Sequence, residues 1–187
     1  VSNFIVRSEP NFAKAIAKTQ PEYQINVESL EKVQPKDLTA SEIDVRLGAT
    51  WLPVDVVENF MYELLETPYY CKLNIKVNFS PFSSEWNITN KSGDRGNVKA
   101  NSTYGTSRIN AYQIIEQTLN LKDVRIFDYV IDDDGKKKPV LNKKETAIAM
   151  EKQDAIKQAF KDWIWNDPER RNRLCEMYNE KFNSIRP

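Results

Sequence analysis

The sequence predicts an α+β fold in which a small antiparallel sheet, a meander plus a hairpin, packs with helices and is followed by a long C-terminal helical pair. Three observations lead to this prediction. Apolar residues recur at three- and four-residue spacing in several segments, which is typical of helices with one buried face. Around residues 72–88 they alternate with polar residues, as in half-buried strands. Asp134 followed by Gly135 is a strong hairpin signal.

The predicted organisation has three parts: a poorly patterned N-terminal arm over residues 1–40, an α+β core over 41–142 and the helical pair over 143–187. For the arm, a short helix over residues 12–18 and a docked or loose segment are alternatives. The helical pair packs either on the core or on regions outside this chain. Because the chain begins at Val1 without an initiator Met and stops just after a predicted helix, we expect it to be part of a longer protein.

The core is expected to begin with two helices. Ser41, with Asp44 three residues later, resembles an N-cap arrangement, and this short helix would end at Gly48. A second helix opens around Pro53, because a first helical turn does not need the N–H that proline lacks. Its apolar residues form a continuous core-facing stripe, and Pro68 ends it.

The strands of the predicted meander follow. Residues 72–79 alternate strictly, with Leu, Ile, Val and Phe on one face and Lys and Asn on the other. Trp86 and Ile88 continue the alternation on a second strand. A third strand is expected over residues 98–103, after a tight loop at 92–96.

A helix and a hairpin complete the core. Asn110 and Gln113 predict a capped helix that runs to about residue 120. A strand over residues 124–131 and its return at residues 140–141 form the predicted hairpin.

The helical pair closes the chain. A core-facing stripe that includes Ile156 and Ile164 predicts the first helix, which starts near Lys143. Asp167 caps the second helix and Pro168 occupies its first turn. The predicted apolar face of the second helix consists of Leu174, Tyr178, Phe182 and Ile185.

Composition limits the partners and the compartment. Lys and Arg total 27, as do Asp and Glu, so the chain has no global positive field that would draw it to nucleic acid or to an anionic membrane. The apolar runs are too short to span a bilayer, and the N-terminus does not resemble a signal peptide. We therefore expect a cytoplasmic protein without a membrane partner. Cys71 and Cys175 are far apart in sequence, and reduced thiols are favoured over a disulfide.

The sequence contains no recognisable catalytic centre. It has no histidine, which removes the usual general base, the commonest metal ligand and every Ser-His or Cys-His pair. Two separated cysteines cannot form a classical zinc site, and the five glycines form neither a phosphate loop nor a dinucleotide-binding fingerprint. We therefore expect no enzyme activity, metal site or cofactor in this chain, and we name no catalytic residue.

The loop at residues 90–108 is the most suggestive stretch for binding. It carries four cations against one anion, is rich in hydroxyl and amide groups, and leads to a predicted helix N-terminus, where free N–H groups favour an anion. One interpretation is contact with phosphate groups. The other is a polar loop whose Ser, Thr and Asn side chains serve turns and caps. The residues proposed for DNA phosphate contact are Lys91, Arg95, Lys99, Thr106, Ser107 and Arg108.

Two aromatic residues are candidates for contact with other domains. Trp163 falls on the apolar stripe of its helix, whereas Trp165 lies off the stripe and either forms an exposed platform or contacts regions outside the chain. Tyr104, in the loop, is the second candidate.

Several runs of the sequence resemble one region of very large proteins of bacterial mobile elements and phages. These runs are SEIDVRLGATWLP at 41–53 and the segments 90–108, 141–146, 167–171 and 178–187, and the similarity covers roughly residues 26–187. Proteins of that family combine an adenine-specific DNA methyltransferase-like module with a Swi/Snf-type superfamily 2 helicase, and the matching region precedes the helicase motor.

This resemblance implies a parent protein that uses ATP to translocate on DNA, and S-adenosylmethionine if its methyltransferase-like module is active. The family's ATP-binding and methyl-transfer motifs do not fall on these residues, so no catalytic role is carried over. The first expected function is an accessory domain that contacts the DNA backbone without sequence preference and loses affinity as salt rises, because each neutralised phosphate releases counterions. The second is a structural module that braces the helicase motor without touching DNA. A stand-alone enzyme with a carboxylate, lysine or tyrosine centre is the third alternative.

Overall fold

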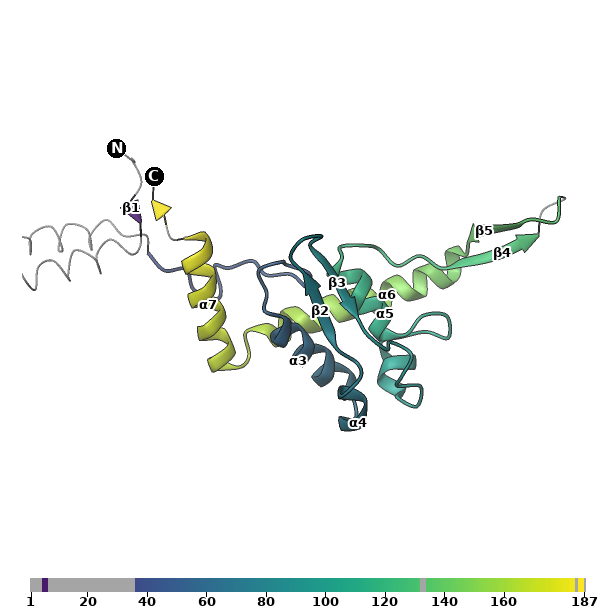
Figure 1. Cartoon of the computed structure of the whole chain (residues 1–187), viewed down its shortest axis with the longest axis horizontal. Coiled ribbons are helices and arrows are strands. Elements are labelled where there is room, and N and C mark those ends of the chain that lie inside the picture. The colour runs from purple at the N-terminus through teal and green to yellow at the C-terminus, as the bar shows by residue number, and fades with distance from the viewer. Residues whose placement is uncertain (1–4, 7–35, 132–133, 184, 187) are drawn as a thin grey trace, which may run out of the picture. The chain divides into compact units, whose positions relative to one another are not determined.

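The computed structural model of the chain describes residues 5–6, 36–131, 134–183 and 185–186 (Figure 1). It confirms the α+β class, because small antiparallel two-stranded sheets pack with helices and two helices follow one another at the C-terminal end. The helix considered at residues 12–18 lies outside the described residues.

Contacts divide the chain into two units. One is Val45–Asn166, and the other combines Val1–Asp44 with Asp167–Pro187. The boundaries expected from the sequence fell after residues 40 and 142, whereas these units change after Asp44 and Asn166. The two C-terminal helices therefore belong to different units.

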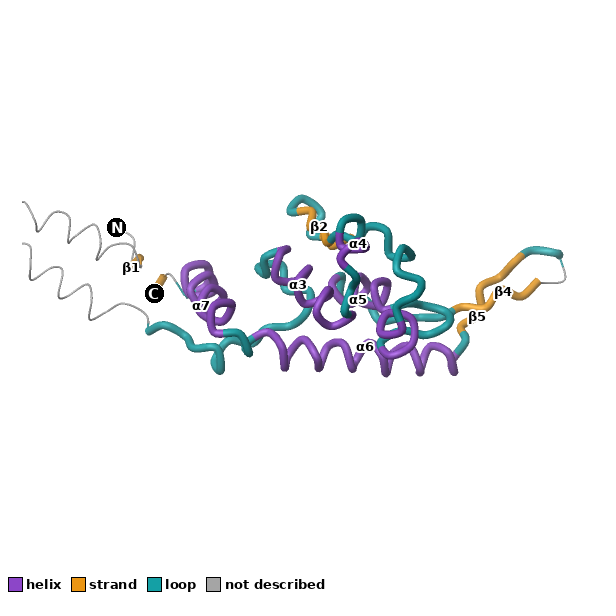
Figure 2. Tube along the Cα trace, turned by 90° about the horizontal axis from the view of Figure 1, so that it is seen from below, coloured by secondary structure: helices purple, strands orange, loops and turns teal. Residues whose placement is uncertain are grey.

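Three helices form the core of the Val45–Asn166 unit. They are α3 (Val54–Leu65), α5 (Ala111–Leu119) and α6 (Lys143–Ile164), and each confirms a predicted helix. Figure 2 shows α6 running along both α3 and α5. Phe60 meets Phe160 edge to face, with ring centroids 5.1 Å apart, which joins α3 to α6.

Local signals set the ends of these helices. At the start of α5, the Asn110 side chain accepts a hydrogen bond from the Gln113 N–H, and the Gln113 side chain accepts one from the Asn110 N–H. This reciprocal pair confirms the predicted capping box. The helix α3 begins directly after Pro53 and ends at Leu65, and its C-cap residue Glu66 adopts a left-handed conformation with φ 47°.

The first hairpin confirms most of the predicted alternation. β2 (Val77–Ser80) pairs antiparallel with β3 (Glu85–Ile88), and Val77 lies opposite Ile88. Both side chains are buried, as is that of Trp86. Because opposite residues share a face of the pleat, these side chains form the part of the sheet that packs on the core.

The strand does not extend back as far as predicted. A helical turn, α4 (Tyr69–Lys72), follows Pro68, and Leu73 is exposed rather than buried. Burial with a period of two begins at Ile75, where the extended backbone begins.

The third strand predicted over residues 98–103 is wrong. The chain there forms a π-helical turn, η2 (Lys99–Thr103), so the first sheet is a hairpin rather than a meander. Two asparagines account for the difference: the Asn97 side chain accepts a hydrogen bond from the Ala100 N–H, and the Asn101 amide donates one to the Asn97 carbonyl. Such local side-chain bonds compete with strand pairing.

The short helix predicted over residues 41–47 is also wrong. Burial in this segment alternates with a period of two, which fits an extended backbone rather than a helix. The buried side chains are those of Ile43, Val45 and Leu47. A capping contact does exist, but it lies earlier: the Glu42 carboxylate accepts hydrogen bonds from the N–H and hydroxyl of Thr39.

The second hairpin confirms the prediction made from Asp134 and Gly135. β4 (Phe127–Ile131) pairs antiparallel with β5 (Lys137–Leu141), and Gly135 in the connection has a φ of 74°. Figures 1 and 2 both show this hairpin extending beyond the helices of its unit.

β4 starts later than the predicted residue 124 because side chains of α6 bind the preceding backbone. Gln153 accepts a hydrogen bond from the Val124 N–H, and Thr146 accepts one from the Ile126 N–H. These main-chain groups are therefore not available to a strand partner.

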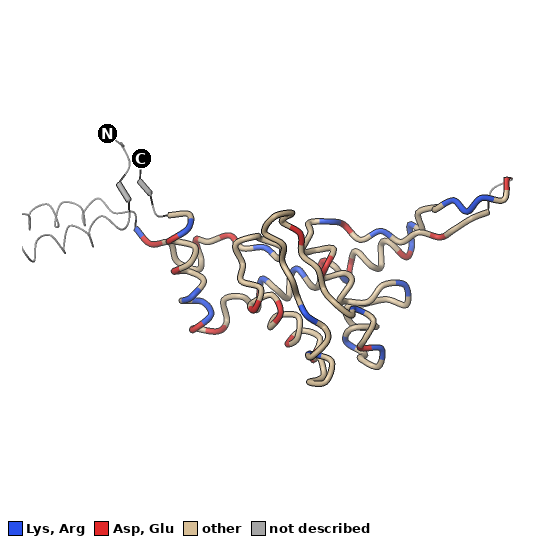
Figure 3. Tube along the Cα trace, viewed as in Figure 1, with Lys and Arg blue, Asp and Glu red and all other residues tan. Residues whose placement is uncertain are grey.

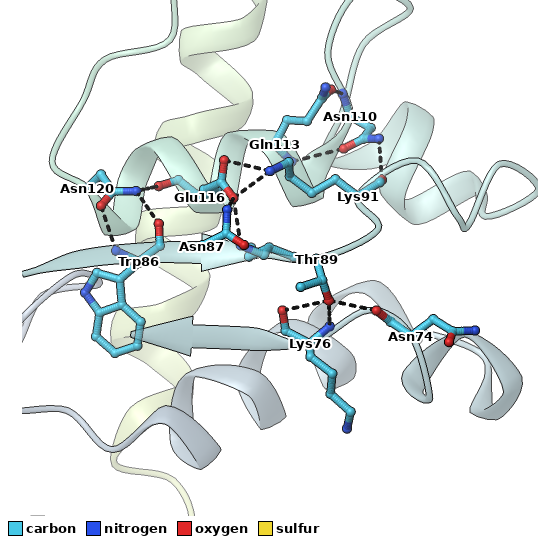
Figure 4. Close-up of polar contacts among 11 residues, drawn as sticks. Asn74, Lys76, Trp86, Asn87, Thr89, Lys91, Asn110, Gln113, Glu116 and Asn120 are labelled. Atoms are coloured by element: carbon cyan, nitrogen blue, oxygen red, sulfur yellow. Dashed lines mark hydrogen bonds and ion pairs between the residues drawn. The ribbon is translucent and has the colours of Figure 1, made fainter. Parts of the chain in front are cut away.

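Side chains bond main-chain groups on both edges of the first hairpin, and Figure 4 shows those on the β3 edge. On the β3 edge, the Asn120 side chain bonds both backbone groups of Trp86, and Glu116 accepts a hydrogen bond from the Ile88 N–H at 2.7 Å. On the β2 edge, Glu58 of α3 accepts one from the first backbone N–H of the strand at 2.9 Å. These contacts occupy main-chain groups that an edge strand otherwise leaves free.

The smaller unit contains the last predicted helix, α7 (Pro168–Phe182). Asp167 caps it by accepting a hydrogen bond from the Arg170 N–H, as predicted. Asn179 is buried on α7, and its side chain bonds both the N–H and the carbonyl of Leu38. This contact fixes the segment before Thr39 against the helix.

One residue of the predicted apolar face of α7 lies outside the helix. The helix ends at Phe182, and Ile185 belongs to β6 (Ile185–Arg186), which pairs antiparallel with β1 (Ile5–Val6). Of the remaining positions, Leu174 is buried, whereas Phe182 is largely exposed.

Candidate functional site

The loop at residues 90–108 connects β3 to α5, and its cations pair with acids of different elements. The Lys91 ammonium lies 2.9 and 2.7 Å from the two carboxylate oxygens of Glu116, and both side chains are partly buried. Figure 4 shows this carboxylate between Lys91 and the backbone of β3. Lys91 is therefore neutralised by an acid that also holds the sheet edge.

Two further cations of the loop are neutralised as well. Lys99 pairs with Glu66, just after α3, at 2.7 Å. Arg108 pairs with Asp128 of β4 at 2.8 Å and donates a second hydrogen bond to the Phe127 carbonyl. The hydrogen bond from the Arg108 guanidinium, and to a lesser extent the one from the Asn142 amide, holds the pKa of the Asp128 carboxyl below its usual range.

Arg95 differs from these three cations. Its side chain is exposed, and it forms no ion pair with any described residue. Of the four loop cations proposed for phosphate contact, Arg95 is therefore the one that no described acid neutralises. Lys91, Lys99 and Arg108 pair with acids of three different elements. Figure 3 shows positive and negative residues interspersed over this unit.

The hydroxyl residues near the end of the loop have different roles. The Thr106 hydroxyl accepts hydrogen bonds from the backbone N–H groups of Arg108 and Ile109, both at 3.1 Å, and thereby shapes the turn before α5. Ser107, between Thr106 and Arg108, is exposed.

The one acid of the loop, Asp94, is buried and anchors it. Its carboxylate accepts hydrogen bonds from the Tyr112 hydroxyl at 2.8 Å and from the Asn97 amide at 2.7 Å. Burial, together with the Asp94 carboxylate, raises the pKa of Tyr112 far above its ordinary value, and burial likewise raises the pKa of the Cys71 thiol. Sequence reasoning counted Asp94 only as a charge, because its partner Tyr112 is 18 residues away.

The two aromatic candidates for interdomain contact are both half-buried. Tyr104 closes η2, where its N–H donates a hydrogen bond to the Lys99 carbonyl. Trp165 is the C-cap residue of α6. Neither side chain forms an exposed platform.

The β4–β5 hairpin carries an exposed apolar surface that sequence reasoning missed. The strand register places Phe127 opposite Leu141 and Tyr129 opposite Pro139. Together with Ile131, these residues form one face of the hairpin, because side chains two apart on a strand share a face. Tyr129 and Ile131 are 70% and 66% exposed. In the sequence the signal is the alternation of Phe127, Tyr129 and Ile131 within the predicted strand.

Two kinds of feature are absent from the described part of the chain. None of its helices combines the length and the apolarity that a membrane crossing requires. Its residues contain no group of three His, Cys, Asp or Glu side chains that could hold a metal ion. Cys71 and Cys175 are free thiols.

Comparison with known proteins identifies a family. A model of the family described as a domain of unknown function, DUF8437, matches residues 46–184. The chain belongs to the DUF8437 family. Comparisons with curated proteins and with solved structures give no match. The DUF8437 match includes the loop, the β4–β5 hairpin and α6, so all of these elements are parts of the family domain.

Proposed function

We propose that the chain is an accessory, non-catalytic module of a larger cytoplasmic protein, and that it docks on another domain of that protein through the apolar face of the β4–β5 hairpin. The observation that carries the proposal is the exposure of Tyr129 and Ile131 on a hairpin that extends beyond its helices. Contiguous apolar surface of this kind is typical of protein interaction sites. An isolated two-stranded hairpin is also marginally stable in water, so a partner that covers it stabilises it.

The resemblance of residues 26–187 to the region before a helicase motor supplies the expected partner, which is the motor itself. In this proposal the motor of the parent protein binds ATP, the methyltransferase-like module is the site for S-adenosylmethionine, and the present chain braces them. The side chains of Glu58, Glu116 and Asn120 bond main-chain groups on the edges of the first hairpin, which supports the choice of the second hairpin as the docking surface.

The test is the association of the chain with a purified helicase motor of that family, measured by calorimetry. We expect Tyr129→Ser with Ile131→Ser to weaken binding by about tenfold or more. The matched control is Tyr69→Ser with Tyr70→Ser, because these two side chains are equally exposed but lie on α4. Binding that is absent, or that is weakened equally by both pairs of substitutions, contradicts the proposal.

DNA phosphate contact is the second candidate function. Arg95 favours it because its guanidinium is exposed and unpaired among the described residues, and the Lys99–Glu66 pair is an exposed ion pair that a phosphate can displace at little cost. Duplex binding measured at rising salt tests it. We expect affinity to fall with salt and Arg95→Ala with Lys99→Ala to weaken binding. Lys143→Ala with Lys144→Ala is the control, because it makes the same change in net charge. Equal weakening of DNA binding by both pairs of substitutions contradicts a specific role for the loop at residues 90–108.

A further inference from the structure

We propose that a basic pocket between the end of α5 and the middle of α6 binds a compact ligand with neighbouring phosphate groups. The pocket has a volume of about 370 Å³. Its charged lining consists of Arg46, Lys122, Lys157 and Lys161, against Asp123 as the acid. All of these residues belong to the Val45–Asn166 unit. The inference is independent of the docking function, since it concerns other residues.

A buried glutamine, Gln153, holds the end of α5 and the middle of α6 together, and these two segments form two sides of the pocket. The Gln153 side chain of α6 donates hydrogen bonds to the Lys122 carbonyl at 2.9 Å and to the Thr118 hydroxyl at 3.0 Å. Leu121, with a φ of 57°, turns the chain at the end of α5. The backbone at Lys122 is therefore tied to α6 one turn before Lys157.

The third side of the pocket is the segment that contains Arg46 and Leu47, and Gly48 allows this segment to approach α5. Gly48 has a φ of 100°, and a Cβ atom built on it would lie 2.5 Å from the Leu119 carbonyl oxygen. The segment that ends at Gly48 is thus pressed against the last turn of α5, which a residue with a side chain would prevent. Arg46, two residues earlier, lines the same pocket as a consequence.

The cations of the pocket are largely unneutralised. Arg46, Lys122 and Lys161 form no ion pair with a described residue, and Lys157 is 3.5 Å from Asp154. Lys157 and Lys161 are one helical turn apart, an arrangement of like charges that destabilises a helix. The loop cations differ in this respect, because Lys91, Lys99 and Arg108 each have an acid within hydrogen-bond distance.

Helix dipoles do not account for this cluster. A cation near a helix C-terminus is stabilised, which explains Lys122 beside α5 and Lys161 in the last turn of α6. It does not explain why Arg46 and Lys157 join them around one cavity. The site is concave, and Leu47 and Leu121 add apolar groups to its lining. A pocket of this kind suits a small ligand with two or three phosphates better than it suits a macromolecule with a flat surface.

The shared chemistry is a set of adjacent phosphate groups, which either a nucleoside polyphosphate or a nucleic-acid backbone supplies. The test is a titration of the full chain with tripolyphosphate, ATP and a duplex oligonucleotide at low ionic strength, followed by amide NMR and calorimetry. We expect saturable binding of tripolyphosphate with shifts centred on the pocket residues. Binding of ATP without duplex assigns the site to a small ligand, and duplex that competes for the same resonances assigns it to nucleic acid.

The deciding variant is Lys157→Ala with Lys161→Ala, for which we expect about a tenfold or greater loss of affinity for tripolyphosphate. Lys157→Arg with Lys161→Arg should retain binding. The control is Lys143→Ala with Lys144→Ala, which removes the same charge from the other end of α6. Absence of saturable binding, resonance shifts away from the pocket, or equal losses in the two alanine pairs overturns the proposal. The resonance map of the unsubstituted chain gives this answer even if a variant does not fold.

Discussion

The Glu116 carboxylate accepts hydrogen bonds from both the Lys91 ammonium and the Ile88 backbone N–H, each at 2.7 Å. A single side chain of α5 thus neutralises a loop cation and closes a strand edge. The two contacts differ in energy, because a backbone donor left without a partner costs more than a partly exposed ion pair contributes.

We therefore expect Glu116→Ala to lower the free energy of unfolding by about 1.5–3 kcal/mol. Lys91→Met removes the cation but leaves the backbone contact, and it should cost less than about 1 kcal/mol. Urea unfolding of both variants measures the difference. Equal losses would mean that the ion pair, and not the strand edge, is the stabilising contact.

Tyr112 makes stability depend on alkaline pH. Its folded-state pKa is raised above the ordinary value of 10.0, so the unfolded chain loses this proton first, and the free energy of unfolding falls as pH rises above about 10. Burial raises the pKa of Cys71 in the same direction. We expect Tyr112→Phe to reduce the slope of stability against pH in this range, whereas Tyr69→Phe, at an exposed position, should not. Thermal unfolding between pH 8 and about 11 tests this, and an unchanged slope in Tyr112→Phe contradicts it.

Gly48 and Gly135 provide a matched pair for backbone strain, since both have positive φ, of 100° and 74°. A Cβ atom at Gly48 meets the Leu119 carbonyl, whereas a Cβ atom at Gly135 meets no atom within 4 Å. Gly48→Ala should therefore cost about 2 kcal/mol or more, and Gly135→Ala about 1 kcal/mol. Chemical unfolding measures both costs, and similar values would show that the contact with α5 is loose.

The Arg108–Asp128 pair predicts a titration shift. Because Arg108 lowers the pKa of Asp128, Arg108→Ala should move that pKa up toward 3.8. A lowered carboxyl pKa contributes stability above its ordinary value and loses that contribution as pH falls through the folded value, so the variant should differ least from the parent in acid. Carboxyl carbon NMR of Asp128 is the direct measurement. An unchanged midpoint would mean that the Asn142 amide, rather than Arg108, sets the pKa.

The helices α3, α5, α6 and α7 were predictable because their signals are local. The capping box at Asn110 and Gln113 and the proline after Asp167 lie within one turn of the elements they start. The same reasoning failed over residues 98–103, where β-branched and small residues suggest a strand but Asn97 and Asn101 bond the nearby backbone instead. The local pattern of polar residues alone does not distinguish a strand from a helical turn of this kind.

The candidate site was less predictable because neutralisation depends on long-range partners. Lys91 and Glu116 are 25 residues apart, and Lys99 and Glu66 are 33 apart, so the loop looks cationic only along the sequence. The pocket had one local signal, the i, i+4 pair Lys157 and Lys161 on a helix. Its other members, Arg46 and Lys122, join them only through packing.

The side chains of Glu58, Glu116 and Asn120 serve β2 and β3 in the way that caps serve a helix. Substitution of these three residues would leave main-chain groups on the hairpin edges without partners, which favours edge-to-edge pairing between copies of the chain.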